Sequence, residues 1–352
     1  MSRRNAIEQQ TVLPLFLAYE ISVDERSLGN LVDVFDTLPR FIWSGKHTTN
    51  TKEMMITKEG RVNDNHFKIT FTAATIRRKR LEDGVWLEES IGCFPGLREE
   101  MVEDALRKLS VSGYGNFVEG QCWVVFKMYD LFTELKQQGH CYSYTELEEA
   151  LTVLAKAHVE IETSGSHGTK INSSPYLPQL SIFRPTAAPI NEARLNPAIE
   201  GLAADKCVAL LHPLISQSIL DKSYRMFDFS ISMSLTSSLA RYLFKILCVK
   251  WRNAAPDRPY TFSMMNFLVN SPRGVSTRMP ENLRAVDAAL KQLLDNNVLS
   301  KVEKEVQKKP RGKGALDYVI SLYPTESYVK FMKRSNAKFS QNTLSKITRK
   351  RP

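Results

Sequence analysis

The order of predicted elements repeats along this chain, and that repetition constrains the fold more than any other feature. In the first half, apolar residues at helical spacing predict three successive helices over residues 97–109, 123–138 and 144–157. Two strands are predicted next, at 158–162 and 177–183, around a turn of Ser, Gly and His residues. Ser143 precedes the third helix and, with Glu146 three residues later, has the spacing of a capping box.

The second half repeats this order. Helices are predicted over residues 235–251, 262–269 and 281–296, and Pro280 stands where first-turn prolines are found. Two strands follow at 298–306 and 317–323. Three helices and a β-ribbon form the order of a winged helix. The sequence therefore predicts an α+β fold with two tandem winged-helix domains.

The boundaries follow from composition. Phe67, Ile69 and Phe71 alternate with polar residues, and Asp83-Gly84 marks a turn after a run of four basic residues, which predicts a β-hairpin with a basic crest. The prolines at 185, 189 and 197 indicate a linker. The expected units are a strand-rich N-terminal extension (1–90), a first winged helix that is a candidate for homodimerisation (91–184), a linker (185–206), a second, DNA-binding winged helix (207–328) and a basic tail (329–352).

Positive charge gathers at the carboxy-terminal end. Residues 301–352 contain fourteen Lys or Arg against four acids, a balance of +10 that equals the formal net charge of the whole chain. A cluster of cations at one end is a candidate site for a polyanion, because each neutralised phosphate releases condensed counterions. A solvated tail is the alternative interpretation. We expect duplex DNA as the partner.

The second winged helix is the better candidate for contacting DNA bases. If the apolar residues of its third helix face the core, Arg284 and Lys291 face outward, and Arg273 and Arg278 lie in the preceding turn. A major groove admits an α-helix, and Arg pairs bidentately with guanine. We expect Arg278 and Arg284 to reach bases or nearby phosphates. The predicted backbone contacts are at the tip of the ribbon: Lys308, Lys309, Arg311 and Lys313.

The first winged helix is a weaker candidate for reading DNA. Its third helix carries Glu146, Glu148 and Glu149, which a duplex repels. Ser143, Tyr144 and Thr145 remain candidates for backbone contacts, with packing as the alternative for the tyrosine. Protein–protein contact, including dimerisation, is the competing role for this half.

Catalytic patterns are not found. Residues 44–48 (SGKHT) echo a phosphate loop, but His47 replaces the required Ser or Thr, and Arg40 stands where the first Gly belongs. No H-x-H, H-E-x-x-H or G-x-S-x-G occurs, and five scattered cysteines suggest reduced thiols. We therefore expect no enzyme activity, cofactor or metal. Without an apolar run of about 18–20 residues or a signal peptide, we expect no membrane association and a cytoplasmic, nucleoid-associated location.

Three stretches carry a resemblance to a known family: FPGLREEMVEDALRKL at 94–109, GHCYSYTELEEAL at 139–151, and LHPL at 211–214 with YRMF at 224–227 and LARYLFK at 239–245. The chain resembles plasmid replication initiators that bind iterons. The resemblance implies binding to repeated duplex sites at a bacterial plasmid origin, opening of A·T-rich DNA, and recruitment of the host helicase, its loader and initiator proteins. Such initiators also control copy number by repressing their own promoter.

Three alternatives remain open at this stage. The first is a winged-helix transcriptional regulator or autorepressor without initiator activity. The others are an enzyme that nicks or primes DNA and a structural chromatin binder. A regulator would not sustain replication of an origin fragment. An enzyme of the second kind would cleave a supercoiled origin plasmid, and a chromatin binder would show no preference for repeats over random duplex.

Overall fold

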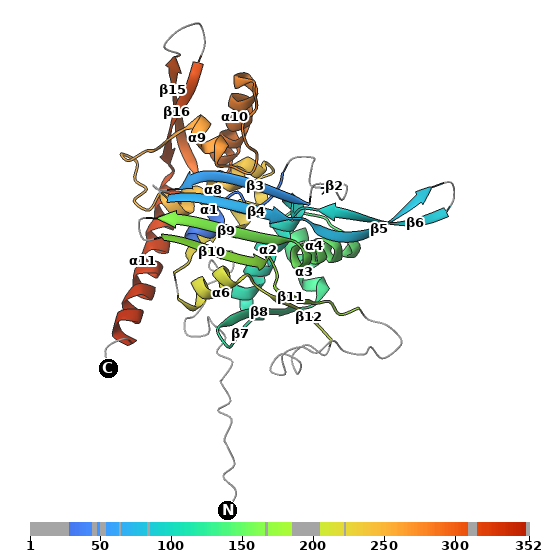
Figure 1. The fold of residues 1–352 in the computed structure, drawn as a ribbon. Helices are drawn as coiled ribbons and strands as arrows, with labels where there is room; N and C mark the ends of the chain where they lie inside the picture. Colours follow the sequence, from blue (N-terminus) through green and yellow to red (C-terminus); the bar gives the residue numbers. More distant parts are fainter. Residues whose placement is uncertain are drawn as a thin grey trace, which may run out of the picture.

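The structure is a computed structural model that describes residues 28–43, 48–49, 54–62, 65–82, 85–165, 168–184, 205–221, 223–308 and 315–349. Helices and strands alternate throughout this part of the chain, so the predicted α+β class is confirmed (Figure 1). The predicted linker lies almost wholly outside the described residues. Among the described residues no helix is both long and apolar enough to cross a membrane.

The C-terminal unit, residues 238–324, contains the second repeat of the predicted order. Its elements are α8 (Ser238–Lys250), β14 (Tyr260–Ser263), α9 (Met264–Val269), α10 (Met279–Asp295), β15 (Leu299–Lys308) and β16 (Ala315–Pro324). The three strands form an antiparallel sheet in the order β14-β16-β15. Val286, Leu290 and Leu293 of α10 are buried, because they repeat at the spacing of one helical face.

The first repeat comprises α2 (Leu97–Leu109), α3 (Met128–Gln137), α4 (Tyr144–Lys156), β9 (His158–Gly165) and β10 (Gly168–Pro175). A short π-helix, η2 (Ser110–Tyr114), extends α2. Two expectations are wrong here. Residues 123–126 belong to a strand, and the partner of β9 is β10 rather than residues 177–183.

The strand at 123–126 is part of β8 (Gln121–Phe126), which joins a sheet in the order β11-β12-β8-β7. Its neighbours are β7 (Gly115–Val118) and β12 (Cys207–Leu210), and β11 (Gln179–Ser181) pairs with β12. The apolar run of β8 suits a helix or a buried strand equally well, and pairing with β12 decides the outcome. Residues from both sides of the predicted linker therefore share one sheet.

Strands before residue 90 also join later parts of the chain. The hairpin β3 (Met55–Val62) and β4 (Asn65–Thr72) extends the β9–β10 pair into a four-stranded sheet, with Ile69 opposite Ile161. Phe67, Ile69 and Phe71 are buried as their alternation predicts. The predicted domain limits stay a prediction, although this strand pairing runs across residue 90.

A hairpin at the basic run is formed by β5 (Ala74–Glu82) and β6 (Val85–Cys93), which project from the body of the molecule in Figure 1. Phe67, Ile69 and Phe71 were expected in the same hairpin strand, but they lie in β4, which belongs to another sheet and pairs with β3 and β9. The two-residue strand β2 (Thr48–Thr49) pairs with β6. Beside α2 and α8 lie β1 (Leu28–Leu31), α1 (Asp33–Thr37), β13 (Arg225–Asp228) and α7 (Phe229–Ser234), and α6 (Pro213–Leu220) packs on β8. Because β1 pairs with β13, the amino-terminal strand is tied to the second half.

Close contact between the halves is visible at one glycine. Gly60 of β3 lies so near α9 that a Cβ added there would stand 2.5 Å from Oδ1 of Asn270. The neighbouring cleft, about 510 Å³, lies between the β3–β4–β9 sheet and α9. The side chains of Asn270 and Phe67 therefore fill the space next to Gly60.

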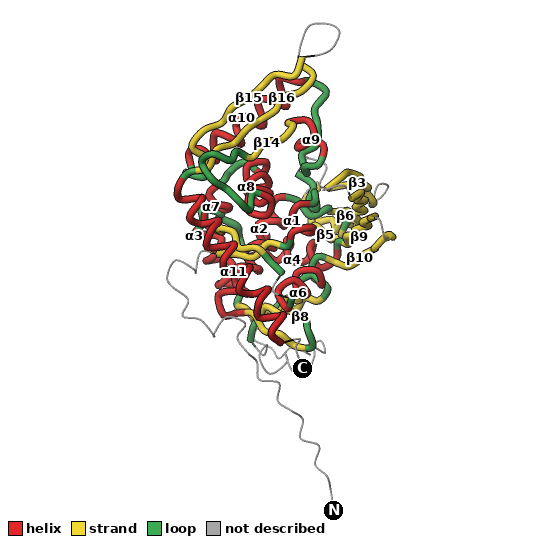
Figure 2. Tube along the Cα trace, turned by 90° about the vertical axis from the view of Figure 1, so that its left-hand side faces the viewer, coloured by secondary structure: helices red, strands yellow, loops and turns green. Residues whose placement is uncertain are grey.

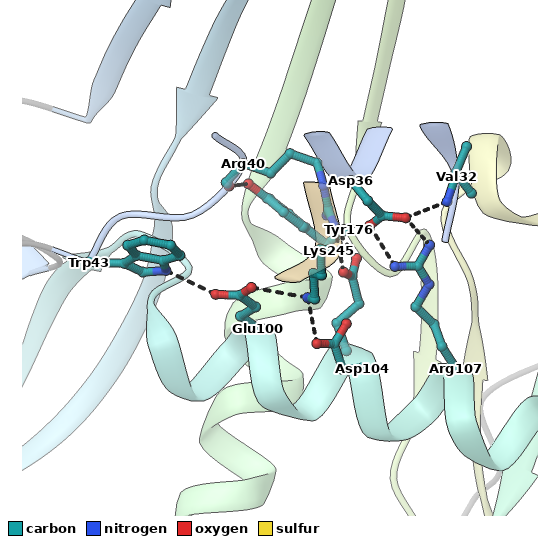
Figure 3. A network of polar contacts seen from close by, with 10 residues as sticks. Val32, Asp36, Arg40, Trp43, Glu100, Asp104, Arg107, Tyr176 and Lys245 are labelled. Atoms are coloured by element: carbon teal, nitrogen blue, oxygen red, sulfur yellow. Dashed lines mark hydrogen bonds and ion pairs between the residues drawn. The ribbon is translucent and has the colours of Figure 1, made fainter. Parts of the chain in front are cut away.

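A buried ionic network joins α1, α2 and α8 (Figure 3). Arg107 donates to Asp36 at 2.7 and 2.8 Å, and Arg40 bridges Asp36 and Glu103. Burial alone would raise the pKa of Asp36, but Arg107 and Arg40 hold it well below its ordinary value. Arg40, one of the two residues that break the phosphate-loop pattern, is therefore part of a buried structural ion pair.

The same network continues from α2 to α8. Lys245 bonds Asp104 at 2.6 Å and Glu100 at 3.1 Å, and Glu100 also accepts a bond from the Trp43 indole. Arg241, one helical turn before Lys245, is fully buried as well. Four of the five cysteines are buried and all are free thiols, as predicted.

The last helix, α11 (Glu326–Arg349), occupies most of the predicted tail. Its first turns are packed into the molecule, because Tyr328, Met332 and Ser335 are buried. Figures 1 and 2 show it starting at the base of the β15–β16 hairpin and running toward the opposite end of the molecule.

Candidate nucleic-acid interface

Helix α10 presents an exposed, basic face to solvent. Arg284, Ala288 and Lys291 are exposed and lie one turn apart along the helix; we refer to them as the α10 stripe. The opposite face is buried against α8. The predicted outward orientation of Arg284 and Lys291 therefore agrees with the structure, while their contact with DNA stays a prediction.

The β15–β16 hairpin stands beside this helix, as both views show (Figures 1 and 2). Alternation along β15 puts Val302, Lys304 and Val306 on one face, opposite Leu322, Ile320 and Tyr318 of β16. Because Ile320 and Leu322 are buried, this face looks toward α10. Lys308 is exposed at the end of β15, and Lys309, Arg311 and Lys313 lie outside the described residues.

A direct bond joins the helix to the hairpin. Lys304 donates to Oδ1 of Asp287 at 2.5 Å, and both side chains are partly exposed. Asp287 lies on the side of α10 that faces β15. The carboxylate that would oppose a phosphate at this place is therefore already paired.

The turn before α10 is held by one buried amide. Asn282 is 1% exposed, its Oδ1 accepts from the Ser276 backbone N–H at 2.8 Å, and its Nδ2 donates to the Ser276 carbonyl at 2.8 Å. Arg273 donates to the same Oδ1 at 3.2 Å and to the Gly274 carbonyl. Gly274 has φ +73°, a backbone conformation that favours glycine. Arg273 therefore bonds within the turn.

Arg278 occupies a different position. It is the N-cap residue of α10, its side chain is 79% exposed, and it pairs with Glu281 only at 3.5 Å. The weak geometry leaves its guanidinium available to a ligand at the entrance of the helix. Of the two arginines predicted in this turn, Arg278 and not Arg273 presents its charge outward.

Helix α9 is fixed to the sheet by Asp317. The Asp317 carboxylate accepts from the Ser263 hydroxyl at 2.5 Å and from the Met265 backbone N–H at 3.0 Å. Ser263 also caps α9, since its hydroxyl accepts from the Asn266 backbone N–H. One acid on β16 thus fixes where α9 begins and, through the turn, where α10 lies.

In the first repeat, α4 is less accessible than α10. Ser143 and Glu146 form the predicted capping box, so both side chains are engaged at the helix start. Tyr144 is 49% exposed and stacks on Phe132, and Thr145 is exposed. These three candidate contacts, Ser143, Tyr144 and Thr145, lie together at one end of α4, and their contact with DNA stays a prediction.

Arginines neutralise the acidic face of α4. Glu149 bonds Arg78 of β5 at 2.8 Å and Arg98 of α2 at 2.9 Å, and Glu148 bonds Arg184. Bonding to Arg78 lowers the pKa of Glu149, with Arg98 acting in the same direction. Strand β5 packs on this helix, which leaves α10 as the more open of the two third helices.

Sequence reasoning missed the residues that hold the interface in place. Asp287, Lys304, Asn282 and Asp317 act through bonds between elements, and composition shows no such pairing. One signal was present for Lys304, because it alternates with Val302 and Val306 on a predicted strand and therefore shares their face.

Several solved structures of other proteins are similar to this chain. No family model matches the chain, and no curated protein matches it. It is similar to a crystal structure of domains 2 and 3 of RctB at 10% identity and a TM-score of 0.49, covering 81% of this chain and 95% of that one. A second structure of those domains gives a TM-score of 0.46 at 10% identity, covering 83% and 97%.

A third similar structure is the Pi initiator protein in complex with iteron DNA. Identity is 10%, the TM-score is 0.40, and the match covers 72% of this chain and 98% of that one. That protein is of the class which the sequence resembles.

Proposed function

We propose that this chain is a sequence-specific duplex-DNA-binding replication initiator that acts without bond-breaking chemistry. In this proposal, α10 enters the major groove at repeated sites of a plasmid origin, and the β15–β16 hairpin contacts the adjacent backbone. Binding of several copies then opens A·T-rich DNA and recruits the host helicase, its loader and initiator proteins. Repression of its own promoter would control copy number.

The α10 stripe carries this proposal. An exposed basic helix face beside a hairpin supports groove reading, because an α-helix of about 10–12 Å diameter fits a major groove of about 12 Å. Asp287 is paired with Lys304, so the acid nearest the stripe is neutralised. Arg278 adds a cation at the helix entrance.

The element order supports a winged helix in the C-terminal unit. In that unit the strand between the first two helices pairs with the last strand, and the helix pair precedes a hairpin. The first repeat has the same helix-helix-helix-hairpin order with β7 and β8 inserted. Two tandem units of this kind would reach successive grooves, and we infer repeats spaced near one helical turn.

Energy for strand opening would come from binding alone. Pyrimidine–purine steps deform at low cost, so an A·T-rich segment beside the repeats would open first. We therefore expect neither Mg²⁺-dependent nicking of a supercoiled origin plasmid nor any cofactor requirement.

A footprint on the DNA that flanks the gene tests the proposal. An initiator would protect several evenly spaced segments, and permanganate would react with thymines in the neighbouring A·T-rich stretch. Absence of protection at low salt would disprove the function.

Replication of an origin fragment separates initiator from regulator. The fragment should be maintained in cells that lack other initiators only when this chain is supplied. Protection of a promoter without maintenance of the fragment would instead identify a transcriptional regulator.

A further inference from the structure

Helix α11 is fixed to the body of the molecule along one face. Tyr328, Met332 and Ser335 are buried. Arg225 of β13 donates to Asn336 at 2.7 Å and lies 4.0 Å from the Phe339 ring centroid. The first part of the helix therefore has a defined orientation relative to the rest of the protein.

The opposite face of α11 is exposed and basic. Lys330, Lys333 and Arg334 are exposed and fall on one side of the helix at spacings of three and four residues; we refer to them as the α11 stripe. In the part of the chain that the structure describes, these three cations form no ion pair. Lys338 continues the line at the margin of the buried face, about 12 Å from Lys330 at 1.5 Å per residue.

This arrangement is electrostatically unfavourable in isolation. Lys330 and Arg334 stand at i, i+4, where like charges destabilise a helix. Glu326 is the only acid in the helix. The acids of α4, in contrast, are paired with cations, Glu148 with Arg184 and Glu149 with Arg78. A polyanion bound along the α11 stripe would relieve this repulsion.

We propose that the α11 stripe is a second, sequence-independent binding surface for the phosphate backbone of duplex DNA. The choice of DNA rests on the proposed function. A lipid surface fits less well, because the apolar face of α11 is already packed against the protein. Each strand of a duplex carries a charge about every 3.4 Å of axis, so the stripe, which spans about 6 Å from Lys330 to Arg334, is long enough to face two phosphates.

The position of α11 shows which DNA it would bind. Figures 1 and 2 place α10 and the hairpin at one end of the molecule and the far part of α11 at the other. The stripe would therefore contact phosphates outside the segment that α10 reads, on flanking DNA that bends around the protein or on a second duplex.

The test compares two double variants of the full chain. Lys330→Gln with Arg334→Gln removes two charges from the stripe. Lys127→Gln with Lys136→Gln removes two exposed charges from the first repeat and serves as the matched control. Binding of a random duplex is measured by fluorescence anisotropy between about 50 and 200 mM salt.

We expect the stripe variant to reduce the log–log salt slope by about 1.8, the value for two phosphate contacts, and the control to leave the slope unchanged. An unchanged slope in the stripe variant, or an equal change in both variants, would overturn the inference. So would binding to phosphatidylserine vesicles that is lost in the variant while its DNA slope stays at the native value.

Failure of this inference is distinguishable from failure of the proposed function. The stripe variant should keep the native preference for repeats over random duplex, because that preference belongs to α10. If the native chain shows no such preference, the proposed function fails whatever the α11 variant does.

Discussion

Lys304 of strand β15 donates a hydrogen bond to Asp287 of helix α10, and this 2.5 Å contact ties the hairpin to the helix beside it. Asp287 would repel a nearby phosphate, and Lys304 would attract it. The pair neutralises the one acid on the hairpin side of the α10 stripe, and it also occupies a cation that would otherwise be available to DNA. Exposed ion pairs contribute only about 0–1 kcal/mol to folding. Its main consequence is therefore expected in DNA binding.

Replacing Asp287 by Asn should strengthen binding to duplex DNA. The change removes a negative charge and releases Lys304 for a phosphate, so the salt slope should steepen by about 0.9. Anisotropy titrations at several salt concentrations measure it. Asp295→Asn, at the end of the same helix, is the control and should change the slope less.

Replacing Arg284 by Ala should relax sequence preference. If the guanidinium pairs bidentately with a guanine, the loss at one base position is about 1–3 kcal/mol, with little effect on random duplex. Competition among single-base variants of the protected repeat measures this. An equal loss on every sequence would make Arg284 a phosphate contact.

Arg273 and Arg278, the two arginines of the turn before α10, should differ in their contribution to the free energy of unfolding. Arg273→Ala removes bonds to Asn282 and Gly274, so we expect the free energy of unfolding to fall by about 1–2 kcal/mol. Arg278→Ala should leave stability nearly unchanged and weaken DNA binding. Urea titrations measure the stability of both variants, and fluorescence anisotropy measures their DNA binding. Equal stability of the two variants would contradict the role of Arg273 in holding the turn.

Lys245 should be critical for the contact between α2 and α8. Burial alone would lower its pKa, but Asp104 and Glu100 raise it, so it stays charged in the folded chain. Lys245→Met leaves two buried carboxylates without their cation and should cost about 3–5 kcal/mol. Adding Glu100→Gln and Asp104→Asn should recover much of that loss in urea titrations. If the triple variant is no more stable than the single one, the ionic explanation is wrong.

His212 should make stability depend on pH. The ring is buried, stacks on Phe35 and accepts from the Leu214 backbone N–H. Burial, with Arg40 and Arg107 adding to it, lowers its pKa to about 3, against about 6.5 in an unfolded chain. The other titratable groups that act on it are His158, which lowers the pKa further, and Asp36, which raises it.

Between these two pKa values only the unfolded chain binds the proton. The free energy of unfolding should therefore fall as pH falls from about 6.5, by up to about 1.4 kcal/mol per pH unit from this group. His212→Asn keeps a capping acceptor but does not titrate, so its stability should decline less steeply between pH 6.5 and 4. Parallel declines for the native and variant proteins would exclude the role.

Sequence patterns predicted the elements that depend on local periodicity. Helix α10 was expected at 281–296 and spans Met279–Asp295, and the β15–β16 hairpin lies within a few residues of its predicted strands. The capping box at Ser143 was confirmed as well. In each case the apolar face, the cap and the turn are close together in sequence.

The wrong predictions concern strands whose pairing partners are far away in the sequence. Residues 123–126 form a strand because β12, more than eighty residues later, pairs with them. The pairings of β1 with β13 and of β4 with β9 are equally remote. The spacing of apolar residues, every second residue in a strand or every 3.6 residues in a helix, does not indicate which distant strand a segment pairs with.

The candidate site divides in the same way. The outward direction of Arg284 and Lys291 follows from one helix and was predictable. The internal bonding of Arg273 was not, because it depends on Asn282, which sits on the helix face where apolar residues were counted. The buried Asn282 is the polar exception on that face, and its bonds to Ser276 explain why.

The bare backbone at Gly60 has a consequence for how the molecule tolerates change. A single methyl group there would act as a wedge, because Oδ1 of Asn270 already occupies the space it needs. Any larger residue at position 60 would therefore require the side chains of Asn270 and of Phe67, which stands equally close, to move away.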